Sequence, residues 1–163
     1  MTASPDIATL YRTHGHIALR RARRLLGNNE DAHDVLQQVF TKLVREPDRF
    51  RGECSFATYL YRVTTITCLQ HMRDTRTRAS LLATRVAPTQ SEAADPVAEN
   101  VSIVRDLIAR LPDDLARVII HRYIDGMTYD EIAEQLGCSR RHVGNLIARS
   151  REVLHDHALE EAS

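Results

Sequence analysis

Five polar or basic side chains gather at the start of one predicted helix in the C-terminal part of the chain. They are Arg140, Arg141, His142, Asn145 and Arg149. The spacing of Arg141, Asn145 and Arg149 places these three on one helix face. Guanidinium and amide groups hydrogen-bond to base edges in the major groove of duplex DNA. Residues 139–151 contain four arginines and no acidic residue, so this helix can also attract phosphate.

Two short helices joined by a tight turn, over residues 128–151, would position these side chains. Thr128 and Glu131 have the spacing of a capping box, which satisfies backbone amides at a helix start. Gly137 suits the left-handed position that ends the first helix, and Ser139 suits the cap of the second. The buried stripe of the second helix is Val143, Leu146, Ile147, Ser150 and Leu154. The pattern predicts a helix-turn-helix; the alternative is a helical hairpin whose charged face is only solvated.

A second group of side chains combines aromatic rings with arginines. Phe56, Tyr59 and Tyr61 lie near the start of a helix predicted from Ser55, and the group continues with Arg62, Arg73 and Arg76. Aromatic rings can stack on unpaired bases while arginines hold the phosphates. The group therefore predicts contact with single-stranded nucleic acid; the alternative is that the rings belong to the protein core.

Helical periodicity organises the remaining chain. It predicts helices over residues 6–26 and 30–45, the second stopped by Pro47, and then over 101–111 and 112–125. The arginines at positions 20–24 are either a contact surface or a solvated face. Residues 81–100, rich in Ala, Thr, Ser, Glu and Pro, predict a flexible linker. We expect an all-α fold with two small helical modules, an N-terminal bundle (1–80) and a four-helix helix-turn-helix module (101–163).

Composition narrows the class of protein. A hydrophobic content of 43% and a charged content of 27% fit a globular chain, and no apolar run or signal-peptide pattern predicts membrane insertion or export. The net charge of 0 divides into +5 over residues 1–80 and −5 over residues 81–163. Three cysteines without a C-x-x-C pair predict reduced thiols in a cytoplasmic protein. No metal-ligand spacing, phosphate loop or nucleophile motif occurs, so we expect neither an enzyme nor a cofactor.

In this order and spacing, several stretches resemble the extracytoplasmic-function (ECF) sigma factors of bacterial RNA polymerase. In the first module they are residues 34–40 (DVLQQVF), 50–52 (FRG) and 55–62 (SFATYLYR). In the second they are residues 111–112 (LP), 122–133 (RYIDGMTYDEIA) and 136–139 (LGCS). The similarity covers nearly the whole chain.

The resemblance implies a division of labour. Core RNA polymerase, through the clamp helices of its β′ subunit, would bind the helix that bears Asp34, Gln37, Gln38 and Phe40, and the β subunit would make further contacts. The helix from Phe56 onward, with the loop before it, would melt and hold the −10 promoter element. The helix from Ser139 would read the −35 element. An anti-sigma factor is a further partner that the resemblance allows.

The chain departs from the common family pattern at several positions. Ile66 stands where an Asn is frequent, Gln70 replaces a frequent Asp, Gln38 replaces a usual Glu, and Gly144-Asn145-Leu146 replaces a common Lys-Ser-Arg run. Two alternatives to a sigma factor follow. One is a stand-alone helix-turn-helix regulator, which leaves residues 34–40 without a role. The other is a degenerate sigma-like protein that binds polymerase without opening promoters, favoured by Ile66 and Gly144.

Overall fold

The computed structural model describes residues 6–85 and 96–163, apart from the side chains of residues 96–99 and 161. Within these ranges every regular element is a helix: there are seven α-helices, one 3₁₀ turn and one π turn, and no strand. The predicted all-α fold is confirmed. Residues 1–71 and 72–163 form two compact units, which are described separately.

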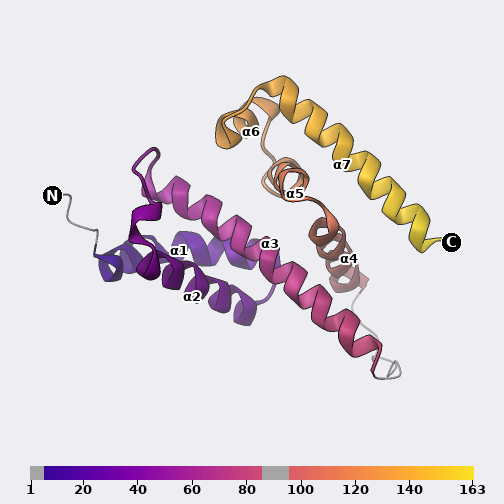
Figure 1. The fold of residues 1–163 in the computed structure, drawn as a ribbon, viewed down its shortest axis with the longest axis horizontal. Helices are drawn as coiled ribbons and strands as arrows, with labels where there is room; N and C mark the ends of the chain where they lie inside the picture. The colour runs from indigo at the N-terminus through magenta and orange to yellow at the C-terminus, as the bar shows by residue number, and fades with distance from the viewer. Residues whose placement is uncertain (1–5, 86–95) are drawn as a thin grey trace. The chain divides into compact units, whose positions relative to one another are not determined.

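The first unit contains three helices (Figure 1). They are α1 (Ile7–Leu26), α2 (Asn29–Arg45) and the first part of α3 (Phe56–Ala83), with the 3₁₀ turn η1 (Pro47–Arg49) after α2. Asp6 caps α1 by accepting a hydrogen bond from the Ala8 amide, and Asn28 caps α2 by accepting one from the Asp31 amide at 2.7 Å. The apolar faces of α1 and α2 pack together; the most buried members are Ala18, Ala22, Leu25, Ala32, Val35 and Val39.

Arg21 differs from its neighbours in the arginine run of α1. Its residue surface is only 4% exposed, its Nε donates to the Thr65 hydroxyl at 3.1 Å, and its guanidinium carbon lies 4.2 Å from the centre of the Tyr61 ring. Arg20, Arg23 and Arg24 are exposed. The run is therefore neither wholly solvated nor wholly a contact surface, because Arg21 joins α1 to α3 inside the unit.

The helices extend into the segment that the sequence predicted as linker. α3 continues to Ala83, where Leu81, Leu82 and Ala83 are all strong helix formers. α4 begins at Pro96, a residue that the first helical position accepts because no backbone amide is required there. Both ends of the predicted linker are thus helical, and the rest of that prediction, residues 86–95, lies outside the described residues.

The second unit contains the four predicted C-terminal helices. They are α4 (Pro96–Arg110), α5 (Asp113–Ile119), α6 (Tyr129–Leu136) and α7 (Arg140–Glu161). α5 is shorter than the predicted helix over 112–125 because it ends in the π turn η2 (Ile120–Ile124), where the Asp125 amide donates to the Ile120 carbonyl at 3.0 Å. His121 and Asp125 pair there at 2.9 Å, with side chains 3% and 6% exposed. The core joins α5 to α7 and α6; its fully buried large side chains include Leu115, Val118, Ile132, Val143 and Ile147.

Candidate nucleic-acid interfaces

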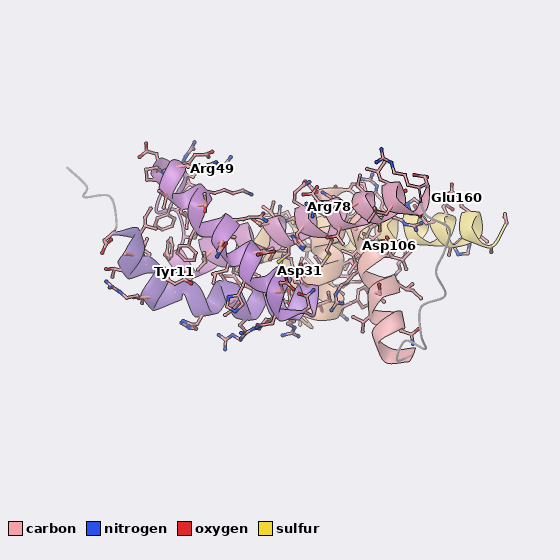
Figure 2. All side chains as sticks on the ribbon, turned by 90° about the horizontal axis from the view of Figure 1, so that it is seen from below. Tyr11, Asp31, Arg49, Arg78, Asp106 and Glu160 are labelled. Carbon is pink, nitrogen blue, oxygen red and sulfur yellow. The ribbon has the colours of Figure 1, made fainter. Side chains whose placement is uncertain are left out.

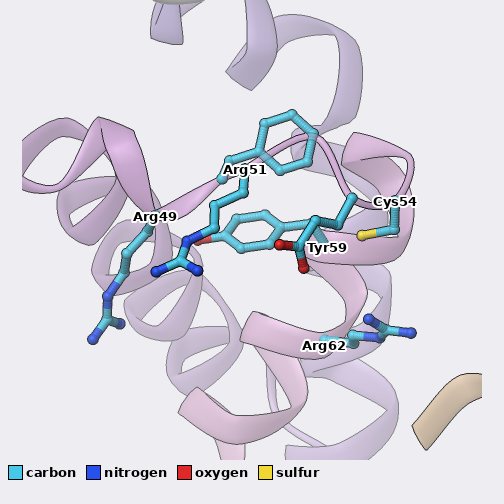
Figure 3. Close-up of a pocket in the computed structure, with 7 residues that line it drawn as sticks. Arg49, Arg51, Cys54, Tyr59 and Arg62 are labelled. Atoms are coloured by element: carbon cyan, nitrogen blue, oxygen red, sulfur yellow. The ribbon is translucent and has the colours of Figure 1, made fainter. Parts of the chain in front are cut away.

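A pocket lies in the first unit where the loop after η1 meets the start of α3. Its volume is about 410 Å³, and Figure 3 shows the side chains that line it: Arg49, Phe50, Arg51, Glu53, Cys54, Tyr59 and Arg62. Three of the seven are arginines and one is acidic, so the lining is positively charged. The chemistry of the lining suits an anion with an aromatic or planar group attached.

Aromatic contacts and a helix cap hold this loop in place. The Phe50 ring lies 5.4 Å from the Phe56 ring and 5.1 Å from the Tyr59 ring, and His14 of α1 contacts Phe56 at 5.1 Å between ring centres. The backbone of Gly52 has φ +74°, a left-handed conformation that glycine adopts without strain. The loop then ends at Ser55, whose Oγ accepts a hydrogen bond from the Thr58 amide at 3.1 Å and so caps α3.

Tyr59 supplies the pocket with a neutral ring. Partial burial raises the pKa of its hydroxyl, and the nearby Arg49 charge opposes this shift only in part. The side chain therefore stays a protonated phenol at neutral pH, with a face available to a planar ligand and a hydroxyl that can donate a hydrogen bond. Stacking on such a ring is tolerant of base identity because every base has a π face.

The structure divides the residues predicted to contact unpaired DNA. Tyr59 and Arg62 line the pocket, while Phe56 belongs to the aromatic cluster that supports it. Tyr61 instead packs under Arg21, within the core of the unit. Arg73, half-buried, and Arg76, exposed, lie farther along α3, beyond the first unit.

The pocket also contains residues that were absent from the predicted set: Arg49, Phe50, Arg51, Glu53 and Cys54. Figure 2 labels Arg49, which lies at the end of η1. The signal that could have found them is the FRG stretch at residues 50–52, which pointed to this loop without giving its residues a role.

The second interface is built on α6 and α7. The Thr128 hydroxyl accepts from the Glu131 amide at 3.3 Å and the Glu131 carboxylate accepts from the Thr128 amide at 2.7 Å, so the predicted capping box is present. These bonds to Thr128 also lower the pKa of Glu131. Gly137 ends α6 at φ 68°, and Ser139 caps α7 by accepting from the His142 amide at 3.1 Å. The predicted helix-turn-helix is confirmed.

α7 separates a buried stripe from an outward basic face. Four of the five stripe residues are buried and Leu154 is half-buried, while Ser150 donates to the Leu146 carbonyl at 2.7 Å. The predicted contact residues are exposed along the first turns: Arg140, Arg141, His142, Asn145 and Arg149. Arg140 pairs with Asp130 of α6 at 3.3 Å, an exposed ion pair of little strength. A capped helix with this exposed face has the chemistry to enter a major groove.

A third surface lies on α2. Asp34, Gln37 and Gln38 are exposed, as a docking surface requires. Phe40, predicted as part of the same surface, is only 6% exposed because the Tyr11 ring packs edge-on against it at 4.9 Å (Tyr11 is labelled in Figure 2). The Phe40 ring therefore packs inside the unit and supports the surface from within.

Two searches of the described residues set limits on other kinds of site. Across residues 6–85 and 96–163, no group of three or more His, Cys, Asp or Glu side chains could hold a metal ion. In the same part of the chain, no helix is both long enough and apolar enough to cross a membrane.

Comparison with known proteins gives two matches to family models, Sigma-70 region 2 over residues 10–78 and Sigma-70 region 4 over residues 102–154. The ECF RNA polymerase sigma-E factor of Haemophilus influenzae is 32% identical over 142 residues, which cover 79% of this chain and 75% of that protein. The sigma-E factor of Escherichia coli K12 is also 32% identical, over 76% of this chain and 72% of that protein.

More distant matches have similar coverage. The ECF RNA polymerase sigma factor SigE of Mycolicibacterium smegmatis is 30% identical over 99% of this chain and 65% of that protein. Among solved structures, the sigma factor RpoE of Bartonella quintana, in complex with the anti-sigma factor NepR, aligns over 91% of this chain and 94% of that chain with a TM-score of 0.49 and 18% identity.

Proposed function

Because the chain belongs to the ECF sigma factors, which direct transcription initiation with RNA polymerase and are not enzymes, we propose how its surfaces divide that work. The pocket beside α3 holds an unpaired strand of the −10 element. The outward face of α7 reads the −35 element as duplex. The exposed face of α2 docks on the clamp helices of the polymerase β′ subunit, with further contacts to the β subunit.

One observation supports this division: the two basic surfaces have different shapes and chemistry. The first is a hollow with aromatic rings and three arginines, which suits bases that have left the stack. The second is a capped helix with guanidinium and amide groups exposed on its first turns, which suits base edges in a groove. Neither surface has the chemistry for the other task.

The α2 surface differs from both. Asp34 is acidic, and Gln37 and Gln38 are neutral hydrogen-bonding groups, so this face has no reason to attract phosphate. A protein partner is the better match. We also propose a cytoplasmic location, where polymerase acts, and an anti-sigma factor as a further partner.

The −35 assignment is tested by Arg141→Ala in the full chain assembled with core polymerase. Loss of one bidentate base contact costs about 1–3 kcal/mol, so run-off transcription from a matching promoter should fall roughly 5- to 150-fold. Core binding in a pull-down should be unchanged. Arg12→Ala, an exposed arginine on α1, is the matched control and should leave transcription at the wild-type level. Loss of both transcription and core binding would contradict the division.

The docking assignment is tested by replacing Asp34 and Gln37 together by Ala. Both side chains are exposed, so the double variant should unfold at the wild-type temperature. Its affinity for core polymerase should fall at least tenfold if each contact contributes about 0.5–1.5 kcal/mol. Replacing the exposed Glu30 and His33 on the same helix is the control. Unchanged core binding of the Asp34 and Gln37 variant would refute this docking surface.

A further inference from the structure

Ile66 is an exposed apolar side chain in the middle of α3. The residue is 46% exposed, and within residues 60–72 only Ile66 and Gln70 are exposed. The flanking residues of this stretch fill the core and are buried: Thr64, Thr65, Thr67, Cys68 and Leu69. Packing inside the unit therefore gives no reason for a large branched apolar side chain at position 66.

The position of Ile66 connects it to the pocket. Helical spacing places it on the same face as Tyr59 and Arg62, which line the pocket, and one turn before Gln70. Arg62 and Ile66 are four residues apart, about 6 Å along the helix axis. Successive nucleotides of one strand in a duplex are about 3.4 Å apart. A strand with one base in the pocket therefore has a neighbouring base, about two steps away, over Ile66.

The charge around this face specifies nucleic acid as what covers Ile66. Arg49, Arg51 and Arg62 at the pocket can hold phosphates along a strand. An isoleucine beside them cannot hydrogen-bond a base edge, but it can contact the apolar face of a base or base pair. Apolar side chains that meet DNA in this way act by separating stacked base steps.

We propose that Ile66 is a wedge that stacks on the base pair next to the unpaired segment and so promotes strand separation. This inference rests on the proposed function, because it requires the −10 element to lie along the pocket face of α3. It gives Ile66 a role in opening DNA that a polar side chain at the same position would perform less well, since a polar group loses its water on stacking against a base.

The test compares paired and pre-opened promoter DNA, using the full chain assembled with core polymerase. One template is a promoter fragment found by run-off transcription; the other carries mismatches over its −10 element. Opening is followed by the fluorescence of 2-aminopurine placed within that element. Ile66→Ala should slow opening of the paired template about tenfold or more, and should leave binding of the mismatched template within about twofold of wild type. Ile66→Asn should behave like Ile66→Ala, and Ile66→Leu should retain most of the activity.

Leu82→Ala is the matched control, because Leu82 is a 62% exposed apolar residue of the same helix outside the region 2 match. It should have no effect on either template. Equal activity of Ile66→Ala and wild type on paired DNA would overturn the proposal. So would equal losses on both templates, since these would mean that Ile66 serves binding or folding rather than opening. Failure of the wild-type chain on both templates would instead refute the proposed function itself.

Discussion

Gly144 offers a direct test of the local physics of the reading helix. It lies in the second turn of α7, where a glycine costs about 1 kcal/mol relative to alanine because it has more backbone freedom to lose on folding. A Cβ added at this position would meet only the Tyr129 ring, at 3.9 Å, which is an ordinary van der Waals distance. Neither strain nor a clash opposes the helix propensity, so Gly144→Ala should stabilise the second unit by about 0.5–1 kcal/mol.

Gly137 is the contrasting position, at the end of α6. No atom lies within 4 Å of an added Cβ there, but the backbone has φ +68°, which costs a residue with a Cβ about 1–2 kcal/mol. Gly137→Ala should therefore destabilise the same unit by about that amount. The same chemical change thus has opposite signs at two positions seven residues apart, and only the backbone conformation differs.

Urea unfolding of the full chain, followed by far-ultraviolet circular dichroism, measures both effects. Gly15→Ala is the control for helix propensity in the other unit, where the added Cβ would lie 3.8 Å from the Tyr11 ring. It should raise stability by a similar amount. If Gly144→Ala destabilised the protein while Gly15→Ala stabilised it, the environment described for α7 would be wrong.

Two further predictions concern buried groups. Burial raises the pKa of the Cys68 thiol to about 12, against 9.0 ordinarily, with a smaller opposing effect from the Arg21 charge. This stability is complete below about pH 9 and is lost as pH rises toward 12, so between pH 9 and 10 the unfolding free energy should fall relative to Cys68→Ala by at most about 1.4 kcal/mol; parallel curves would contradict it. Asp125→Ala should cost about 1–3 kcal/mol, because it removes the buried bond to His121, whereas Asp130→Ala, which breaks only an exposed pair with Arg140, should change stability by less than about 1 kcal/mol in the same urea assay.

The helix-turn-helix could be predicted from sequence because its determinants are local. The partners of the capping box are three residues apart, Gly137 lies directly after α6, and the buried stripe of α7 repeats at helical spacing. Each of these patterns specifies a backbone state without reference to the rest of the fold. The same holds for the caps and lengths of α1 and α2.

The pocket could be predicted only in part, because it depends on contacts between distant segments. The loop conformation is set by Phe50 against Phe56 and Tyr59, and by His14, which comes from another helix. Arg21 shows the same limit in the opposite sense. Hydrophobic periodicity assigns an arginine to the surface, and only the Tyr61 ring and the Thr65 hydroxyl make a buried position possible.

The two proposed DNA-binding surfaces cannot exchange their roles, for reasons of shape. An unpaired base exposes both faces and must be covered on them, so it needs a concave site with rings, such as the pocket beside Tyr59. A paired base exposes only its edge, so it needs a narrow convex element whose side chains reach outward, such as the first turns of α7. Arginine serves both surfaces because both ligands carry phosphate. What distinguishes them is therefore the packing behind the arginines: aromatic rings behind Arg51 and Arg62, and an aliphatic helix stripe behind Arg141 and Arg149.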